Sequence, residues 1–478
     1  MYKTAKFISH NNLSFFIYLV PLPAMVVTPH DLGTEKISTL LARYAIPAII
    51  AMASASLYNI IDSIFIGHGV EHGALAISGL AIAMPMMNIS SALGAMVGIG
   101  SAAIISINLG EGKRERTFRI LGNMVLLNVI IGVAMAAIAL LFLDRLLLLF
   151  GASEATLPYA RDFMQVILLG SIITHIFMGQ NEVLRASGYP RKSMWIMLTA
   201  IGVTCALNAL FIFGFGWGVR GSAFATVLAQ IVALGLQTVH FCSRTSFLHY
   251  RRGIFRLRRR IIGGILSIGI APFLLHLCAS VVVVFVNKAL MQTGGDLYVG
   301  AYGIVNRVVL LFIMLCAGFN QGMQPIVGFN YGARNYDRVV RTLRLTIFCA
   351  VCVMTVGFIL GMAIPHQVAM LFLGETTEDA GRLVGAAAQG MRIVMSIFPI
   401  VGFQIVTANF FQYIGKAPKA IFLSLTRQLL FLLPLLLLLP PRYGSMGVWL
   451  SFPISDGVAS LLAGVLLWVQ IRQFKKFS

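Results

Sequence analysis

Charged residues are scarce in this sequence. Only 11% of its 478 residues are Asp, Glu, Lys or Arg, whereas 58% are hydrophobic. A soluble globular domain carries roughly 25% charged residues. Apolar stretches of about 20 residues, long enough to cross a bilayer as a helix, recur along the whole chain. The composition therefore indicates an integral membrane protein, with no gap long enough for a separate soluble domain.

The common sequence patterns of catalysis and of metal binding are also missing. The six cysteines lie in or beside apolar segments without metal-ligand spacing, which favours free thiols. No P-loop occurs, so direct use of ATP is not encoded, and no HExxH or CxxC occurs. A membrane-bound enzyme, such as an acyltransferase, would need a catalytic His or paired carboxylates at a membrane face, and none stands out. The function class that remains is transport driven by an ion gradient, which needs no cofactor.

Acidic residues are the rarer of the two signs of charge. The chain has 16 Asp and Glu against 36 Lys and Arg, a net charge of +20. Connections after the even-numbered apolar spans are the more basic ones, and residues 244–260 alone hold seven arginines. In a membrane protein this bias predicts cytoplasmic termini and a cytoplasmic linker, rather than a nucleic-acid partner. An anionic lipid is a further possible partner of that linker.

We predict an all-α polytopic membrane protein with about twelve spans in two parallel six-helix repeats. The spans are expected near 37–66, 76–107, 118–142, 159–183, 193–214, 219–242, 261–290, 297–329, 343–364, 383–412, 419–439 and 446–470. They define an N-terminal bundle, a basic linker, a C-terminal bundle and a basic tail, at 37–243, 244–260, 261–470 and 471–478.

The first 36 residues do not fit this pattern. Early lysines precede a short apolar run broken by Pro21 and Pro23, which resembles a signal peptide without a convincing cleavage site. An upstream extension, with Met25 as the working start, explains the segment equally well. Residues 1–36 are therefore treated as an N-terminal extension, either disordered or a mis-assigned start, with no functional role.

The two halves of the chain resemble each other. At a shift of 222 residues, Gly110 pairs with Gly332, and "GSAAIISINLGEGKRERTFR" matches "QGMQPIVGFNYGARNYDRVVR". At a shift of 225, Asp62 pairs with Asn287. Both halves begin on the same side, so the repeats are parallel. Transporters built in this way bind substrate between the halves and alternate access by rocking them.

Asp62 is the most informative charged residue. Ser54, Tyr58 and Asn59 share its face of a helix, and Pro47 allows a bend upstream. An ionisable group inside the bilayer is costly, so it usually faces a cavity and serves a function. Such a carboxyl group can hold a proton, a metal cation or a cationic substrate, but not all at once, which is a sufficient basis for antiport. The alternative is a buried structural carboxylate satisfied by Tyr58 and a backbone amide.

The C-terminal half offers weaker candidates. Asp456 is as well explained by structural hydrogen bonding as by cavity lining, and Asn287 enters as the repeat mate of Asp62. Arg307, Arg392 and Arg427 also lie in spans. Their expected partners are carbonyls or carboxylates of the same half; arginines facing the cavity would instead favour an anionic substrate. Ser54, Asn59, Asn287 and Asp456 are thus the candidate cavity residues.

Several motifs together resemble the multidrug and toxic compound extrusion (MATE) transporters. These are "YNIIDSIFIG", with Pro47 upstream, "LRASGYPRKS", "GWGVRGSAFATVLAQ" and "GFNYGARNYDRVVR", and the match covers roughly residues 31–470. The resemblance implies two six-helix bundles around a V-shaped cavity. It further implies export of drugs or organic cations across the cytoplasmic (inner) membrane, in exchange for H+ or Na+.

The resemblance also implies an ion-coupling cluster in the N-terminal bundle. Asp62 and Tyr58 match its span-one residues, Thr204 and Asn208 match span-five positions, and Thr226 matches the span-six threonine. Asn208 stands where many relatives have an aspartate, which leaves Asp62 as the only carboxylate. One carboxylate with neutral oxygens favours H+ over Na+, since a dehydrated Na+ needs several ligands.

A lipid-linked oligosaccharide flippase of the same superfamily is the alternative. Such proteins tend to have extra spans and several arginines facing the cavity. The two functions are distinguished by whether Arg307, Arg392 and Arg427 point into it.

Overall fold

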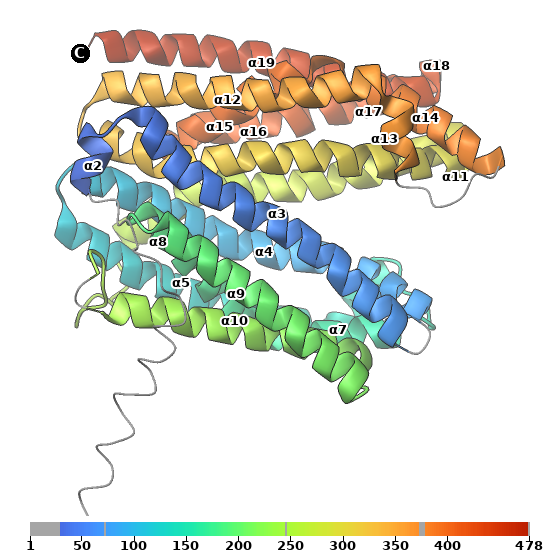
Figure 1. Ribbon diagram of the computed structural model, residues 1–478, viewed down its shortest axis with the longest axis horizontal. Coiled ribbons are helices and arrows are strands. Elements are labelled where there is room, and N and C mark those ends of the chain that lie inside the picture. The colour runs from blue at the N-terminus through green and yellow to red at the C-terminus, as the bar shows by residue number, and fades with distance from the viewer. Residues whose placement is uncertain (1–28, 71–72, 244–245, 372–377, 477–478) are drawn as a thin grey trace, which may run out of the picture.

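The computed structural model describes residues 29–70, 73–243, 246–371 and 378–476, and the regular structure in these ranges is entirely helical. The helices form two groups that lie together at one end of the molecule and diverge toward the other (Figure 1). Each group surrounds its own apolar core. The arrangement is the V of two bundles that the sequence predicts.

The N-terminal group holds the candidate coupling residues. Its helices are α3 (Ile37–Gly69), α4 (Gly73–Gly110), α5 (Arg114–Leu141), α6 (Leu143–Leu149), α7 (Leu157–Leu169), α8 (Ser171–Ala186), α9 (Pro190–Asn208), the π-helical turn η1 (Ala209–Gly214) and α10 (Gly218–Cys242). Helix α3 continues without a break through Pro47.

The C-terminal group repeats this plan. Its helices are α11 (Arg259–Gly332), α12 (Tyr336–Ala363), α13 (Pro365–Met370), α14 (Glu378–Val394), the 3-10 turn η2 (Met395–Ile397), α15 (Phe398–Tyr413), α16 (Ala417–Leu425), the π-helical η3 (Thr426–Leu432), α17 (Leu433–Leu438), α18 (Pro440–Tyr443) and α19 (Ser445–Lys475).

The described residues account for the twelve expected spans. Ten helices or helix runs are long and apolar enough to cross a membrane, and the bent pair α7–α8 makes up to eleven. Helix α11 is in fact two helices, because Gly295 interrupts it with φ 67° and ψ −165°. A positive φ of this size favours glycine, which lets one span end and the next begin without a loop. Counting α11 as two spans gives the predicted twelve.

Paired glycines bring the two groups together. A Cβ atom on Gly110 would overlap the carbonyl oxygen of Phe329, and one on Gly332 would overlap that of Ile107. Gly110 and Gly332 are repeat mates, and Ile107 and Phe329 have the same spacing of 222. The contact is therefore pseudo-symmetric. Glycine is needed there because the helices approach too closely for any side chain.

A short helix, α2 (Pro29–Thr34), precedes α3 and lies within the range assigned to the N-terminal extension. Leu32 is buried, and its carbonyl oxygen accepts hydrogen bonds from Asn330 (2.9 Å) and Arg338 (3.2 Å). The start of the described chain is thereby attached to the C-terminal group. The rest of the extension, residues 1–28, lies outside the described residues.

Candidate ion-coupling site

The Asp62 carboxylate lies where α3 meets α9 and α10. Asn208 Nδ2 donates a hydrogen bond to Asp62 Oδ1 at 2.7 Å, and Ser222 Oγ donates to the same oxygen at 2.9 Å. Asp62 is seven residues before the end of α3, so it lies about 10 Å along the helix from that end. One carboxylate oxygen thus connects three helices of the N-terminal group.

A second contact repeats this geometry one turn away. The hydroxyl groups of Tyr58 and Thr226 are 3.3 Å apart and share a hydrogen bond. Tyr58 precedes Asp62 by four residues, and Thr226 follows Ser222 by four, so α3 and α10 run antiparallel here with matching polar faces. The two pairs form a short polar ladder between these helices.

Asn208 carries an oxygen without a partner. Its Oδ1 atom is buried and accepts no hydrogen bond from the described residues, although its Nδ2 atom binds Asp62. A buried acceptor left unpaired is costly, so such a group often indicates an absent water or ion. The amide oxygen and the carboxylate together form an acceptor pair that a cation or a hydrogen-bond donor could satisfy.

The other predicted residues of the cluster lie differently. Thr204 is buried one turn before Asn208, but its hydroxyl donates to the carbonyl oxygen of Ala200 on its own helix at 2.8 Å. Ser54 is half-buried on α3, and Asn287 is half-buried on α11 in the other group. The Asn59 side chain lies outside the described ones.

Asp456 is paired with an arginine. Arg427 Nε donates to Asp456 Oδ1 at 2.6 Å, and Ser455 Oγ donates to the carbonyl oxygen of Arg427 at 2.6 Å. The side chains of Arg427 and Asp456 are only 20% and 9% exposed. This ion pair agrees with the expectation of a carboxylate partner in the same half. Arg307 and Arg392, by contrast, are exposed.

Ser222 was not among the residues predicted from the sequence. Its position four residues before Thr226 was the available signal, because that spacing puts both hydroxyls on one helix face. The close packing of α3 against α10 was needed to bring it to Asp62.

Two groups of membrane-spanning helices that repeat one plan are an architecture found in many transporters. Comparison with known families is more specific. The MatE family model matches residues 47–210 and 270–437, one stretch in each half. The chain belongs to the MatE family, and it is a transporter, not an enzyme.

Curated relatives carry the same family resemblance along most of their length. "Multidrug export protein MepA" of Staphylococcus haemolyticus is 24% identical over 425 residues, covering 89% of this chain and 92% of the relative. The protein of the same name from Staphylococcus aureus strain MRSA252 is 24% identical over 431 residues, with the same coverage.

Solved structures agree on the fold. A MATE-family multidrug resistance transporter in an outward-facing conformation has a TM-score of 0.87 at 24% identity, covering 93% of this chain and 98% of that one. A MOP-superfamily transporter from Pyrococcus furiosus, described as having a binding pocket of reversed polarity, has a TM-score of 0.86 with the same identity and coverage. These matches confirm the predicted two-bundle architecture.

Proposed function

We propose that this chain is a secondary active antiporter that exports drugs or organic cations across the cytoplasmic membrane in exchange for H+ or Na+. The names of the curated relatives support drug export. The observation that supports ion exchange is the Asp62 carboxylate, which accepts hydrogen bonds from two neutral donors on two other helices. It has no cationic partner among the described residues, so its negative charge is left for an ion from outside the protein.

Ion binding at Asp62 is mechanically linked to helix packing. Asp62 Oδ1 accepts both hydrogen bonds, and a proton or cation on this carboxylate weakens them, because it neutralises the charge that Asn208 and Ser222 stabilise. This weakening alters how α3 lies against α9 and α10. We infer that this rearrangement weakens the substrate site and releases the substrate outward, while the bundles 37–243 and 261–470 rock against each other.

The coupling ion remains H+ or Na+ in this proposal. A proton needs only the carboxylate, whereas a dehydrated Na+ needs several oxygens. The free Oδ1 of Asn208 supplies one further oxygen next to Asp62, and the hydroxyls of Tyr58 and Thr226 lie one turn away. Proton coupling requires fewer ligands and is the working choice.

The proposed orientation has both termini in the cytoplasm. Helix α2 and the C-terminus lie at the same end of the molecule, and the basic linker lies there too (Figure 1). Basic residues collect on the cytoplasmic side of membrane proteins. In that orientation the two groups meet at the cytoplasmic end and diverge outward.

Transport by the purified protein in liposomes tests the proposal. Ethidium and a small panel of neutral and anionic dyes would be followed under an imposed pH gradient, and separately under an imposed Na+ gradient. We expect ethidium movement driven by the pH gradient, sensitive to a protonophore and lost in Asp62→Asn. Asp144→Asn is the matched control, because it removes a carboxylate paired with Arg161 in an exposed salt bridge. Undiminished transport by Asp62→Asn would refute the coupling role.

The same liposomes distinguish the flippase alternative. A flippase for lipid-linked oligosaccharides would need free arginines for pyrophosphate, but Arg427 is already bound to Asp456, which leaves Arg307 and Arg392. Fluorescent polyprenyl-pyrophosphate sugar would be scored for transfer between leaflets. Transfer of this lipid without any dye transport would replace the antiporter proposal with the flippase.

A further inference from the structure

The linker between the two bundles is a docked structure. Asn123 of α5 holds its backbone on both sides of Leu257: Nδ2 donates to the Arg256 carbonyl oxygen at 3.0 Å, and Oδ1 accepts from the Arg258 backbone N–H at 2.8 Å. Ile254 is buried and packs directly against Gly122 on the same helix. This part of the chain therefore has a fixed position on α5.

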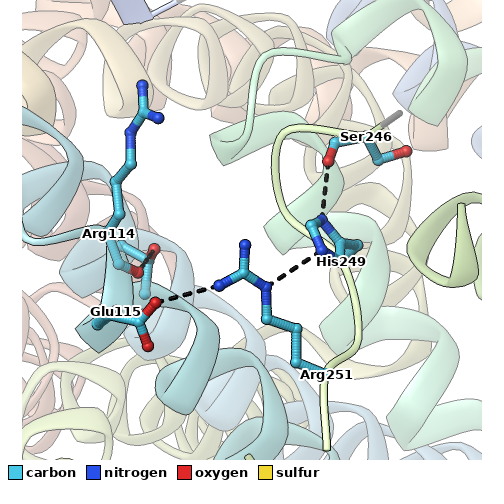
Figure 2. Close-up of polar contacts among 6 residues, drawn as sticks. Arg114, Glu115, Ser246, His249 and Arg251 are labelled. Carbon is cyan, nitrogen blue, oxygen red and sulfur yellow. Dashed lines mark hydrogen bonds and ion pairs between the residues drawn. The ribbon is translucent and has the colours of Figure 1, made fainter. Parts of the chain in front are cut away.

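Arg251 attaches the preceding part of the linker to the start of α5. Its Nη1 atom donates to Glu115 Oε1 at 3.1 Å, and its Nε atom donates to His249 Nε2 at 3.1 Å (Figure 2). The guanidinium carbon also lies 3.9 Å from the centre of the Phe118 ring. Gln180 adds a hydrogen bond to the Tyr250 hydroxyl at 2.7 Å. Arg251 is thus used for attachment and is not free to bind a partner.

The other arginines of the linker's described part, residues 246–260, are free. Their side chains are exposed, and no described residue forms an ion pair or a side-chain hydrogen bond with them; they are Arg252, Arg256, Arg258, Arg259 and Arg260. Between them stand two apolar side chains, Phe255 at 46% and Leu257 at 50% exposed. The docked backbone therefore presents alternating cationic and apolar groups, here called the arginine surface (residues 252–260).

The arginine surface lies beside the end of a membrane-spanning helix. Helix α5 has 28 residues, a length of about 42 Å, whereas the hydrocarbon core is about 30 Å thick. Its first turns, Arg114 to Asn123, therefore reach the headgroup level, and these turns hold the linker. Helices α5 and α10 also form the flank of the N-terminal group farther from α12 and α19 (Figure 1). The linker lies at the same end of the molecule as the start of α5, so the exposed side chains of the arginine surface are at headgroup level.

We propose that the arginine surface binds the headgroups of anionic phospholipids in the cytoplasmic leaflet. The arginines match phosphate and other anionic headgroup groups, and Phe255 and Leu257 can enter the adjoining acyl region. Topology alone requires only basic residues on this side, not a backbone fixed at two points or apolar side chains exposed between the charges. The proposal does not depend on the transport function.

Lipid selectivity of the full-length protein tests this. The protein is reconstituted in phosphatidylcholine vesicles with a trace of spin-labelled phosphatidylglycerol, or of equally labelled phosphatidylcholine. Electron spin resonance gives the immobilised fraction of each. One arginine near the membrane surface contributes about a fivefold preference for an anionic over a neutral lipid. After averaging over all boundary lipids, we expect the immobilised fraction of phosphatidylglycerol to be about threefold that of phosphatidylcholine. In about 0.5 M NaCl the two fractions should become nearly equal.

A triple variant is compared with a matched control. Arg256→Gln, Arg258→Gln and Arg260→Gln together should remove most of the preference. The control changes three exposed basic residues of the C-terminal group, Arg341→Gln, Arg344→Gln and Lys475→Gln, and should keep it. An equal loss in both triples, or an unchanged preference in the linker triple, would overturn the proposal.

Two further measurements test whether the ligand is a membrane lipid or a soluble anion. Phe255→Ser with Leu257→Ser should lower immobilisation of the anionic lipid, because the apolar contact with the acyl region is lost; no change would overturn this part of the proposal. Inorganic phosphate, added at ionic strength matched with chloride, should leave the preference unaltered. If phosphate abolished it, the surface would be a site for a soluble anion and the lipid proposal would be wrong.

Discussion

Asp62 and Asp456, one carboxylate in each group of helices, have opposite surroundings. Asp62, in the N-terminal group, accepts hydrogen bonds from the neutral groups of Asn208 and Ser222. Asp456, in the C-terminal group, is bound to the guanidinium of Arg427. One charge is compensated inside the protein and the other is not. Under the proposed function, the first carboxylate exchanges ions and the second holds the structure together.

The repeat makes this comparison sharper. The two halves keep the glycines that let them touch, Gly110 and Gly332, in equivalent contacts. They do not keep the ionisable residues, since the repeat mate of Asp62 is Asn287. Shared packing with unshared chemistry is expected when both bundles must rock but only one must bind the coupling ion. The following predictions test that division of roles.

The largest effect is expected from breaking the ion pair. Asp456→Leu leaves the largely buried Arg427 without its partner, which costs about 3–5 kcal/mol. The variant should lose thermal stability, measured by fluorescence-detected size exclusion after heating in detergent. Adding Arg427→Met should restore most of it, because an apolar pair of similar size needs no compensating charge. Asp144→Leu, at the exposed pair with Arg161, should cost less than about 1 kcal/mol.

Two results would contradict a purely structural role of Asp456. One is unchanged stability in Asp456→Leu, and the other is a stable double variant that transports no ethidium. The second result would mean that the pair itself takes part in transport.

The next effect concerns the choice of ion. Asn208→Asp places a second carboxylate within hydrogen-bond distance of Asp62. Two unit charges about 4 Å apart repel by about 1–4 kcal/mol, so the pair should gain about tenfold or more in affinity for a cation. We expect ethidium transport in liposomes to become stimulated by an inward Na+ gradient. Asn287→Asp, at the repeat mate, should not produce Na+ stimulation. Equal stimulation by both would remove the distinction between the halves.

Much of the fold follows from the sequence. Twelve apolar spans and the repeat at a shift of 222 predict the two bundles, because a span needs only length and hydrophobicity. Breaks inside spans are harder to predict. The 56° bend between α7 and α8, and the π-helical turns η1 and η3, arise from packing between helices and leave no clear composition signal.

The site was only partly predictable. Asp62 is evident because a carboxylate in an apolar run is rare, and Thr226 comes with the family resemblance. Ser222 has only the weak signal of its spacing from Thr226, because serine is common in helices and its role depends on α10 packing against α3, which places it next to Asp62. Likewise, 29 residues separate Arg427 from Asp456, and only tertiary packing pairs them.

Ser222→Ala should have an intermediate effect. It removes one of two hydrogen bonds to Asp62 Oδ1, and a hydrogen bond to a charged group contributes about 1.5–3 kcal/mol. We expect about a tenfold loss in the rate of pH-driven ethidium transport, with a smaller loss of heat stability than in Asp456→Leu. The control is Ser451→Ala in α19, whose hydroxyl donates only to the Gly447 carbonyl oxygen of its own helix. A loss of rate in the control as large as in Ser222→Ala would point to a general packing defect.

Tyr58→Phe should have the smallest effect. It deletes the 3.3 Å hydrogen bond to Thr226, one turn from Asp62, and a neutral hydrogen bond contributes about 0.5–1.5 kcal/mol. The transport rate should fall about twofold to tenfold, and Thr226→Val should produce a similar loss. Because both changes remove the same bond, the double variant should be no slower than the slower single variant. Additive losses would mean that Tyr58 and Thr226 act separately, and that the polar ladder between α3 and α10 is not a functional unit.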